Sequence, residues 1–272
     1  MISFVGAGPG AEDLITLRGI NRLKDADTVI WASSLVPSSI LNHCQKSPDL
    51  FDSSGMTLED VLRIYDERHV SSNIVRLHSG DPTIYGAIQE QIEYCISSNY
   101  DFEVVPGVSS LAATASSIAK ELTLPKVSQT IIQTRLPNRT VNSMPPNETL
   151  ANLTASGSTM AIYLSAANPT KLQSELLKPP SAYKKDTPVA IAIKVSWPDE
   201  KIILTTVGNL AETLKQAGAT TTVLVVVGEV LRDKKVARSH LYSPDFAHRY
   251  RKKSNAESTQ GRPTGTTPGK VV

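Results

Sequence analysis

The chain has 272 residues, of which 40% are hydrophobic and 20% charged, and its formal net charge is +2. This composition supports a packed core and excludes wholesale disorder, and at roughly 100–200 residues per domain it predicts one large domain or two moderate ones. No apolar run approaches the ~20 residues that a membrane-spanning helix needs. The first residues run into Gly6 without a basic segment, so we expect no signal peptide.

Charge and cysteine content suggest where the protein works. Residues 232–272 contain ten Lys/Arg and three Asp/Glu, a net +7, which leaves −5 for residues 1–231. Such a tail could contact nucleic acid or an anionic surface, or it could be a solvated end, and its composition predicts disorder from about residue 252.

The two cysteines, Cys44 and Cys95, are not in a metal-binding spacing. We therefore expect no disulfide framework, no cysteine zinc site and a cytoplasmic location.

Short apolar runs alternate with helical patterns over the first half of the chain. Strands are predicted at residues 2–5, 28–31, 74–77, 102–105 and 129–134. Helices are predicted at residues 14–23, from the N-cap Thr57 through Tyr65, and at residues 84–96 and 109–120. This alternation predicts βαβ units and a mostly parallel sheet, in which ligands bind outside the carboxyl ends of the strands.

A second domain is predicted after a linker. Residues 135–146 are polar, contain three prolines and lack periodicity, as is typical of a linker. Beyond it, helices are predicted near 148–153 and at 170–177 and 210–217, and strands at 159–164, 189–193, 201–206 and 223–227. Two consecutive strands on either side of residues 197–200 indicate a mixed sheet. The prediction is an α/β protein with domains at 1–136 and 147–231 and a basic tail at 232–272.

The first strand is followed by a glycine turn whose ligand the sequence leaves open. Residues 6–11 read Gly-Ala-Gly-Pro-Gly-Ala, which satisfies the loose G-x-G-x-x-G/A form of dinucleotide-binding turns. However, Pro9 removes a backbone donor that phosphates would need, and the second strand ends without an acidic residue for a ribose. The alternatives are a tight turn whose glycines let chain segments approach, and a site for a ligand without phosphate.

Two further turns follow predicted strands. Asp81 stands between Gly80 and Pro82, and the proline restricts it to extended geometry, so its carboxylate either faces a cleft or caps the turn. Ser109 and Ser110 stand at the start of a predicted helix. Either both serines contact a ligand, or Ser109 is simply the N-cap of that helix. Three such turns at one edge of one sheet indicate a shared site.

These turns resemble the signatures of the tetrapyrrole methylases, which use S-adenosylmethionine. The matching stretches are residues 5–10 with 13–19, 80–86 and 105–110. Other stretches are similar to the branch of that family that methylates precorrin-4 in cobalamin synthesis, namely residues 34–36, 52–58, 121–130, 196–201 and 241–251. The resemblance runs from residue 2 to about residue 251.

The resemblance implies a homodimer of two-domain α/β chains, with S-adenosylmethionine between the domains and methyl transfer to carbon 11 of precorrin-4 or cobalt-precorrin-4. The implied cofactor-binding residues are Pro9, Ser79, Gly80, Asp81, Ile84, Ser109, Ser110, Leu164 and Val195. At the position of Ala87, uroporphyrinogen methylases usually carry an arginine. At the position of Ser33 they carry an aspartate that is proposed as a base. These departures favour the precorrin-4 branch and leave the catalytic residues unassigned. A uroporphyrinogen methylase, or a non-catalytic ligand- or nucleic-acid-binding protein, remains the alternative.

The implied substrate carries several carboxylates, which basic side chains would bind. Lys126 and Arg135 are the candidates named for substrate binding, and Arg139 and Lys194 also lie near the predicted cleft. The five histidines have no metal-ligand spacing, so no metal is expected. His78, next to the cleft, is either functional or a half-buried strand residue. No nucleophilic side chain is required, because a carbon of the tetrapyrrole accepts the methyl group.

Overall fold

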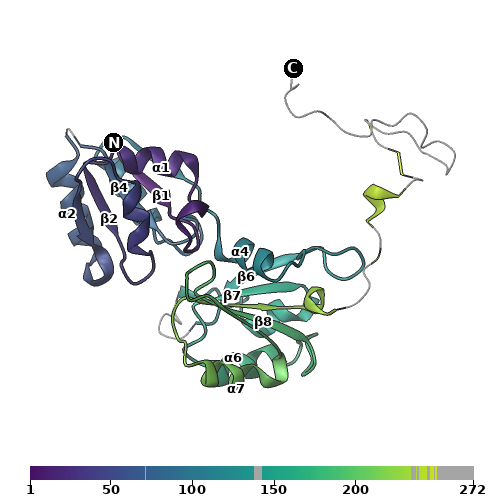
Figure 1. Ribbon diagram of the computed structural model, residues 1–272. Coiled ribbons are helices and arrows are strands. Elements are labelled where there is room, and N and C mark those ends of the chain that lie inside the picture. Colours follow the sequence, from purple (N-terminus) through teal and green to yellow (C-terminus); the bar gives the residue numbers. More distant parts are fainter. Residues whose placement is uncertain are drawn as a thin grey trace.

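The computed structural model describes residues 1–70, 72–137, 143–233, 237, 239–243, 246–247 and 249. These residues form two α/β domains, each built on a five-stranded sheet (Figure 1). Neither the segment beyond residue 252 nor most of the basic tail is among them, so the predicted disorder lies outside the described residues. Within the described part, no helix is long and apolar enough to cross a membrane.

The N-terminal sheet is parallel throughout, as predicted, with the strand order β3-β2-β4-β1-β5. Its strands are β1 (Ile2–Gly6), β2 (Thr28–Trp31), β3 (Asp49–Asp52), β4 (Ile74–His78) and β5 (Phe102–Val105). Side chains alternate between two cores. Val5 packs with Leu23 of α1 (Leu17–Lys24) on one face, and Phe4 packs with Tyr65 of α2 (Leu58–Arg68) on the other. The second face also carries α3 (Gln89–Ser97).

The strand β3 was not predicted. Its residues are Asp-Leu-Phe-Asp, and three of the four are exposed because β3 lies at the sheet edge and pairs with β2 alone. An edge strand with charged ends has no apolar run, and periodicity cannot detect it.

Helix starts follow the local capping residues. Thr57 is the N-cap of α2, as predicted, and it forms a capping box with Asp60. The helix α1 begins later than predicted, because Thr16 caps it and Glu12–Leu14 form a separate 3-10 turn, η1. The helix α3 also begins later than predicted, after Tyr85 and Ala87, whose left-handed φ angles of 56° and 50° prevent a continuous helix.

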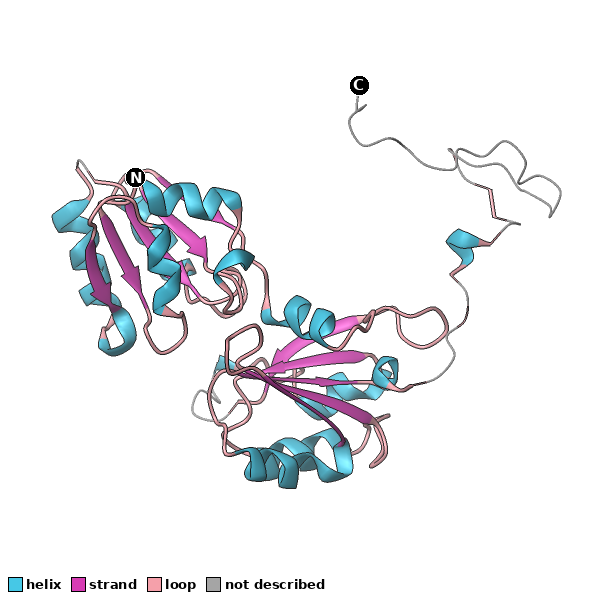
Figure 2. Ribbon diagram, in the orientation of Figure 1, coloured by secondary structure: helices cyan, strands magenta, loops and turns pink. Residues whose placement is uncertain are grey.

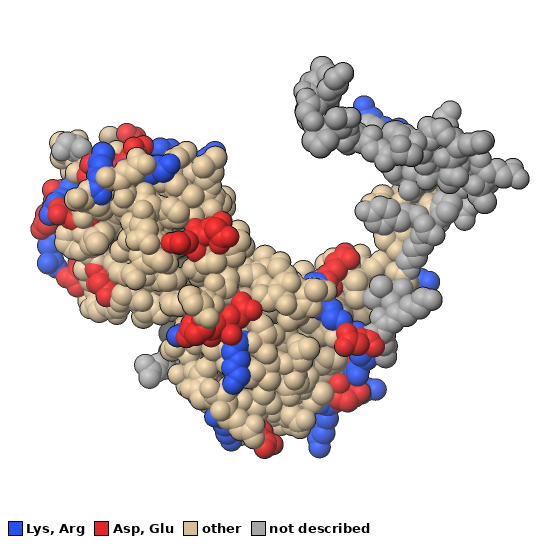
Figure 3. Space-filling model, in the orientation of Figure 1, with Lys and Arg blue, Asp and Glu red and all other residues tan. Residues whose placement is uncertain are grey.

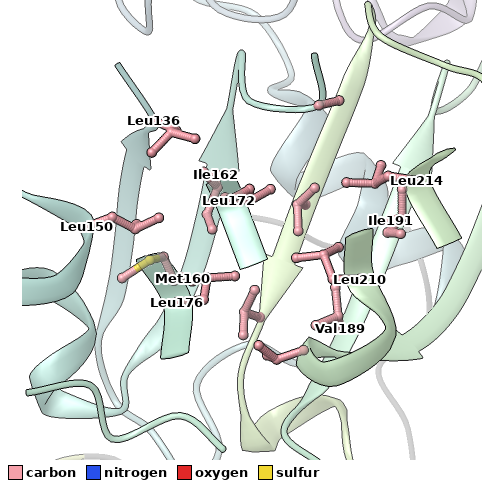
Figure 4. Close-up of a cluster of buried hydrophobic side chains, with 14 of the residues drawn as sticks. Leu136, Leu150, Met160, Ile162, Leu172, Leu176, Val189, Ile191, Leu210 and Leu214 are labelled. Carbon is pink, nitrogen blue, oxygen red and sulfur yellow. The ribbon is translucent and has the colours of Figure 1, made fainter. Parts of the chain in front are cut away.

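The C-terminal sheet is mixed, as predicted, with the order β6-β7-β10-β8-β9. Figure 2 shows the strands of both sheets in magenta and the helices beside them in cyan. Its strands are β6 (Ile131–Arg135), β7 (Thr159–Tyr163), β8 (Pro188–Ile193), β9 (Lys201–Thr206) and β10 (Val223–Val227). The pair β6–β7 is parallel and the other pairs are antiparallel. The helices α5 (Leu150–Leu153), α6 (Pro169–Leu177) and α7 (Leu210–Ala217) pack against one face, where leucines of α6 and α7 meet Met160, Ile162 and Ile191 of the strands (Figure 4). Further 3-10 turns are Ser38–His43, Ser53–Gly55, Thr154–Ser156, Val207–Asn209, Glu229–Leu231 and His240–Tyr242.

The strand at residues 129–134 was expected in the N-terminal sheet, and this placement was wrong. The strand β6 pairs with β7 of the second sheet, and α4 (Ser110–Ser117) packs against that sheet as well, since Leu111 and Ala113 belong to the same buried cluster as Ala190 and Val226. The chain therefore changes from one sheet to the other between β5 and α4, not at the predicted linker, residues 135–146. Periodicity identifies a strand but does not show which sheet it joins.

Candidate active site

Three glycine-bearing turns meet at the carboxyl ends of β1, β4 and β5, because these strands are neighbours in the sheet. Gly80 N–H donates to the Gly8 carbonyl oxygen at 2.8 Å. A Cβ added to Gly107 would lie 2.1 Å from the Gly80 carbonyl oxygen and 2.8 Å from the Cα of Gly6. The glycines therefore allow close backbone contact, as in the tight-turn interpretation, and they bring the three turns together.

Asp81 connects the second turn to the third. One carboxylate oxygen accepts hydrogen bonds from the Thr83 N–H at 2.8 Å and from the Thr83 hydroxyl, and the other accepts from the Gly107 N–H at 2.9 Å. Partial burial by itself would raise the pKa of Asp81, but these hydrogen bonds outweigh it and lower the pKa below the usual 3.8. Asp81 is therefore held as a carboxylate at the sheet edge.

The third turn leads into α4. Ser109 is its N-cap, since the Ser109 hydroxyl accepts a hydrogen bond from the Ala112 N–H at 3.4 Å. The N-cap interpretation of Ser109 is thus confirmed. Because α4 packs on the second sheet, this turn also connects the two domains.

The second domain contributes the opposite wall. Leu164 follows β7 in a left-handed conformation with φ 53°, and 67% of it is exposed, whereas Val195 after β8 is 4% exposed. Thr220–Thr222 precede β10, which runs antiparallel to β7 and β8, so the start of β10 lies beside their ends.

These walls enclose a cavity of about 320 Å³, within the range of small-molecule sites. All nine residues predicted to bind the cofactor line it. The other lining residues were not predicted to bind the cofactor; they are Leu35, Tyr85, Tyr163, Ser165, Ala166, Ala192, Thr220, Thr221, Thr222, Val223 and Leu224. The three threonines precede β10, so their place at the cavity follows only from the antiparallel direction of β10, which sequence patterns do not show.

The lining chemistry argues against a dinucleotide. None of the described residues that line the cavity is Lys, Arg or His, and Asp81 supplies its carboxylate. A pyrophosphate would find no cation there. The glycine turn also does not open a helix, because η1, with Glu12 and Asp13, comes before α1. The residues instead fit a neutral or cationic ligand with hydroxyl and amino groups.

A second cavity, of about 370 Å³, shares Tyr85 with the first and is also lined by Arg135 and Glu148. The guanidinium of Arg135 donates to the Ser143 hydroxyl at 2.7 Å. Between the two cavities, Tyr85 contacts Tyr163 with 5.4 Å between ring centroids. Burial is the main reason that the pKa of Tyr163 rises to about 12, so both rings stay neutral at physiological pH.

Two of the other basic candidates, Lys126 and Lys194, do not line these cavities. Lys126 is exposed in the loop before β6, at the end of the sheet opposite to Arg135. Lys194 forms an ion pair with Asp199 at 2.6 Å. Arg139 lies outside the described residues. Of the two residues predicted to bind substrate, Arg135 lines the second cavity and Lys126 lines neither.

His78 is more buried than expected. Its side chain is 7% exposed, and burial, together with the nearby Arg76, lowers its pKa to about 3. It is not among the residues that line the cavity. His78 is therefore a neutral core residue at neutral pH.

The fold and the cavity define a two-domain α/β protein with a cavity lined by both domains. The chain belongs to the tetrapyrrole (corrin/porphyrin) methylases, whose family model matches residues 1–211. This confirms the resemblance drawn from the turns.

Individual relatives narrow the comparison. The chain is 43% identical over 252 residues to a cobalt-precorrin-4 C(11)-methyltransferase of Methanocaldococcus jannaschii, covering 92% of this chain and 96% of the relative. The crystal structure of a cobalamin biosynthetic enzyme, cobalt precorrin-4 methyltransferase, matches with a TM-score of 0.80 and 36% identity, covering 85% of this chain and 95% of that one. The uroporphyrin-III C-methyltransferase of Thermus thermophilus, complexed with S-adenosylhomocysteine, shares the fold with a TM-score of 0.70 at 23% identity, covering 85% of this chain and 98% of that one.

Proposed function

We propose that this protein transfers a methyl group from S-adenosylmethionine to carbon 11 of precorrin-4 or cobalt-precorrin-4 in cobalamin synthesis. The observation that carries the proposal is the nearly full-length similarity, at 43% identity, to a cobalt-precorrin-4 C(11)-methyltransferase. The convergence of all nine predicted cofactor residues on one cavity supports it.

The cavity suits S-adenosylmethionine in its chemistry. When bound, this cofactor supplies an electrophilic methyl group on a sulfonium. Asp81 would accept hydrogen bonds from the amino group or the ribose hydroxyls, and the hydroxyls of Ser110 and Thr221 offer further polar contacts. The side chains of Ile84, Leu164 and Val195 would contact the apolar parts. The described lining residues include no Lys or Arg, so none of them repels the positive charge of the sulfonium.

The second cavity is the proposed place for the substrate. Arg135 would bind one of its carboxylates through its planar fork of donors. Because Tyr85 lines both cavities, a tetrapyrrole held by Arg135 would lie beside the cofactor.

The chain's residues would act mainly by orientation. Holding the methyl donor and the ring carbon in line can contribute about 7–11 kcal/mol to lowering the barrier. No side chain needs to form a covalent bond, since the ring carbon is the nucleophile.

Incubation with methyl-labelled S-adenosylmethionine and a panel of tetrapyrroles tests the proposal. Label is expected on precorrin-4 or cobalt-precorrin-4, and comparing the two decides whether cobalt is already in the ring. Label on uroporphyrinogen III with none on either precorrin-4 form would overturn the proposed substrate.

Removal of residues 252–272 is expected to leave turnover unchanged, whereas loss of function would favour a role for the basic tail. On the face drawn in Figure 3, described Lys and Arg are interspersed with Asp and Glu, so this view gives no support to nucleic-acid binding.

We also propose a cytoplasmic homodimer. Both cysteines are free thiols, in agreement with a reducing compartment. Sedimentation at micromolar concentration is expected to give twice the 29.3 kDa chain mass, and a single-chain mass would contradict the dimer.

A further inference from the structure

A loop of the C-terminal domain contacts the glycine turn of the N-terminal domain beside the first cavity. In this loop, residues 194–200 between β8 and β9, the indole Nε1–H of Trp197 donates to the Pro9 carbonyl oxygen at 3.0 Å. The Ala11 N–H donates to the Ser196 hydroxyl oxygen at 2.9 Å. Two partly buried hydrogen bonds therefore join the domains at this point.

The 194–200 loop has a defined conformation of its own. Lys194 and Ser196 are left-handed, with φ angles of 47° and 65°. The Ser196 N–H donates to a Glu200 carboxylate oxygen at 2.5 Å. The Lys194 ammonium, paired with Asp199, lies 5.6 Å from the centroid of the Trp197 ring. These contacts hold the indole in place, so little ordering is needed for it to reach the glycine turn.

The contact borders the cavity from both domains. Pro9, whose carbonyl accepts the indole N–H, lines the cavity, and so does Val195, the neighbour of Ser196 in the chain. The chain crosses between the sheets at a different place, residues 106–109. The hydrogen bond from Trp197 to Pro9 therefore joins the two walls of the cavity, one from each domain.

We propose that Ser196 and Trp197 form an interdomain latch that holds the two walls of the cavity at the spacing needed by the cofactor, with Trp197 as the positioning residue. The identity of the ligand rests on the proposed function, but the contact itself does not.

Gly10 gives a sharp test of the latch. A Cβ on Gly10 would lie 2.1 Å from Cδ1 of the Trp197 indole, and the backbone of Gly10 is not left-handed, so alanine displaces the indole without straining its own residue. Trp197→Phe keeps an aromatic ring but removes the donor. Each change is expected to weaken S-adenosylhomocysteine binding about 2- to 10-fold in calorimetric titrations.

The two positions should also depend on each other. In a Trp197→Ala background the space beside Gly10 is open, so Gly10→Ala is expected to have no further effect on affinity. Ser196→Ala, which removes the second bond and little volume, should weaken binding in the same direction. Gly55→Ala is the matched control, because nothing lies within 4 Å of the added Cβ.

A fluorescence measurement tests the contact without any ligand. The chain has two tryptophans, so Trp31→Phe leaves Trp197 as the remaining emitter. Gly10→Ala in that background is expected to increase acrylamide quenching of Trp197. Wild-type affinity in Gly10→Ala and Trp197→Phe, with unaltered melting temperature, would overturn the latch. If the wild-type chain does not bind S-adenosylhomocysteine, the proposed function fails instead, and unchanged quenching in Gly10→Ala then decides against the latch independently.

Discussion

The carboxylate of Asp81 accepts a hydrogen bond from the backbone N–H of Gly107 at 2.9 Å, and this contact ties together the turns that follow β4 and β5. Thr83 provides two further donors to the same carboxylate. An ionised carboxylate has about four acceptor positions, so one remains for a ligand. Asp81 can therefore cap its turn and contact a cofactor at once, and the two interpretations drawn from the sequence do not exclude each other.

We predict that Asp81→Ala reduces both cofactor affinity and stability. Loss of a charge-assisted hydrogen bond to the ligand, about 1.5–3 kcal/mol, corresponds to a 10- to 100-fold higher Kd for S-adenosylhomocysteine. The melting temperature should also fall, because the Gly107 and Thr83 N–H groups lose their acceptor. Calorimetry and thermal unfolding on the same variant measure the two effects. A less stable protein with unchanged affinity would show that Asp81 serves the turn alone.

We predict that Gly107→Ala destabilises the fold. The added Cβ would lie 2.1 Å from the backbone oxygen of Gly80, which no side-chain rotation can relieve. Overpacking of this kind costs about 1–3 kcal/mol or more, to be measured by urea unfolding. Gly55→Ala, with open space around the new methyl group, should change stability by about 0.5 kcal/mol or less. Equal effects of the two substitutions would contradict the packing of the turns.

We predict that Arg135→Gln impairs use of the tetrapyrrole but not of the cofactor. Removing one charge-assisted contact to a carboxylate should lower kcat/KM for the tetrapyrrole about 10- to 100-fold, while the KM for S-adenosylmethionine stays unchanged. Lys126→Gln is the control, because Lys126 is exposed and lines neither cavity. If Lys126→Gln were the variant that lost activity, the placement of the substrate in the second cavity would be wrong.

We predict that His78 makes the fold sensitive to mild acid. Burial lowers its folded-state pKa to about 3, below the unfolded value of 6.5, so between these values the unfolded chain binds a proton that the folded chain does not. Stability must therefore fall as the pH drops from 6.5 toward 3, by up to about 1.4 kcal/mol per pH unit.

His78→Leu should remove that dependence. Between pH 7.5 and pH 4.5, the variant is expected to lose about 2–3 kcal/mol less unfolding free energy than the wild type. His240→Gln, at an exposed position, serves as the control. The same acid dependence in His78→Leu and in the wild type would show that His78 does not carry the effect.

Much of the site was predictable because its determinants are local. Gly80, Asp81 and Ser109 follow apolar runs that any parallel sheet would bury, and parallel strands bring their carboxyl ends to one edge. Strand positions such as 28–31 and 102–105 match β2 and β5, because their apolar runs are short and bounded by polar or turn residues.

The remaining features depend on contacts between distant segments, which local patterns do not encode. Whether β6 joins the first sheet or the second depends on its pairing with β7, and this pairing places Arg135 at the cavity edge and Lys126 at the opposite end. The antiparallel direction of β10 brings Thr220–Thr222 to the cavity, and the bond from Trp197 to Pro9 joins residues far apart in the chain. Local patterns predict every described strand except β3, together with the turns at their ends, because periodicity and turn chemistry act over a few residues. Which of those strand ends meet follows from strand pairing and from the contacts between the domains, because both are selected by packing over the whole chain.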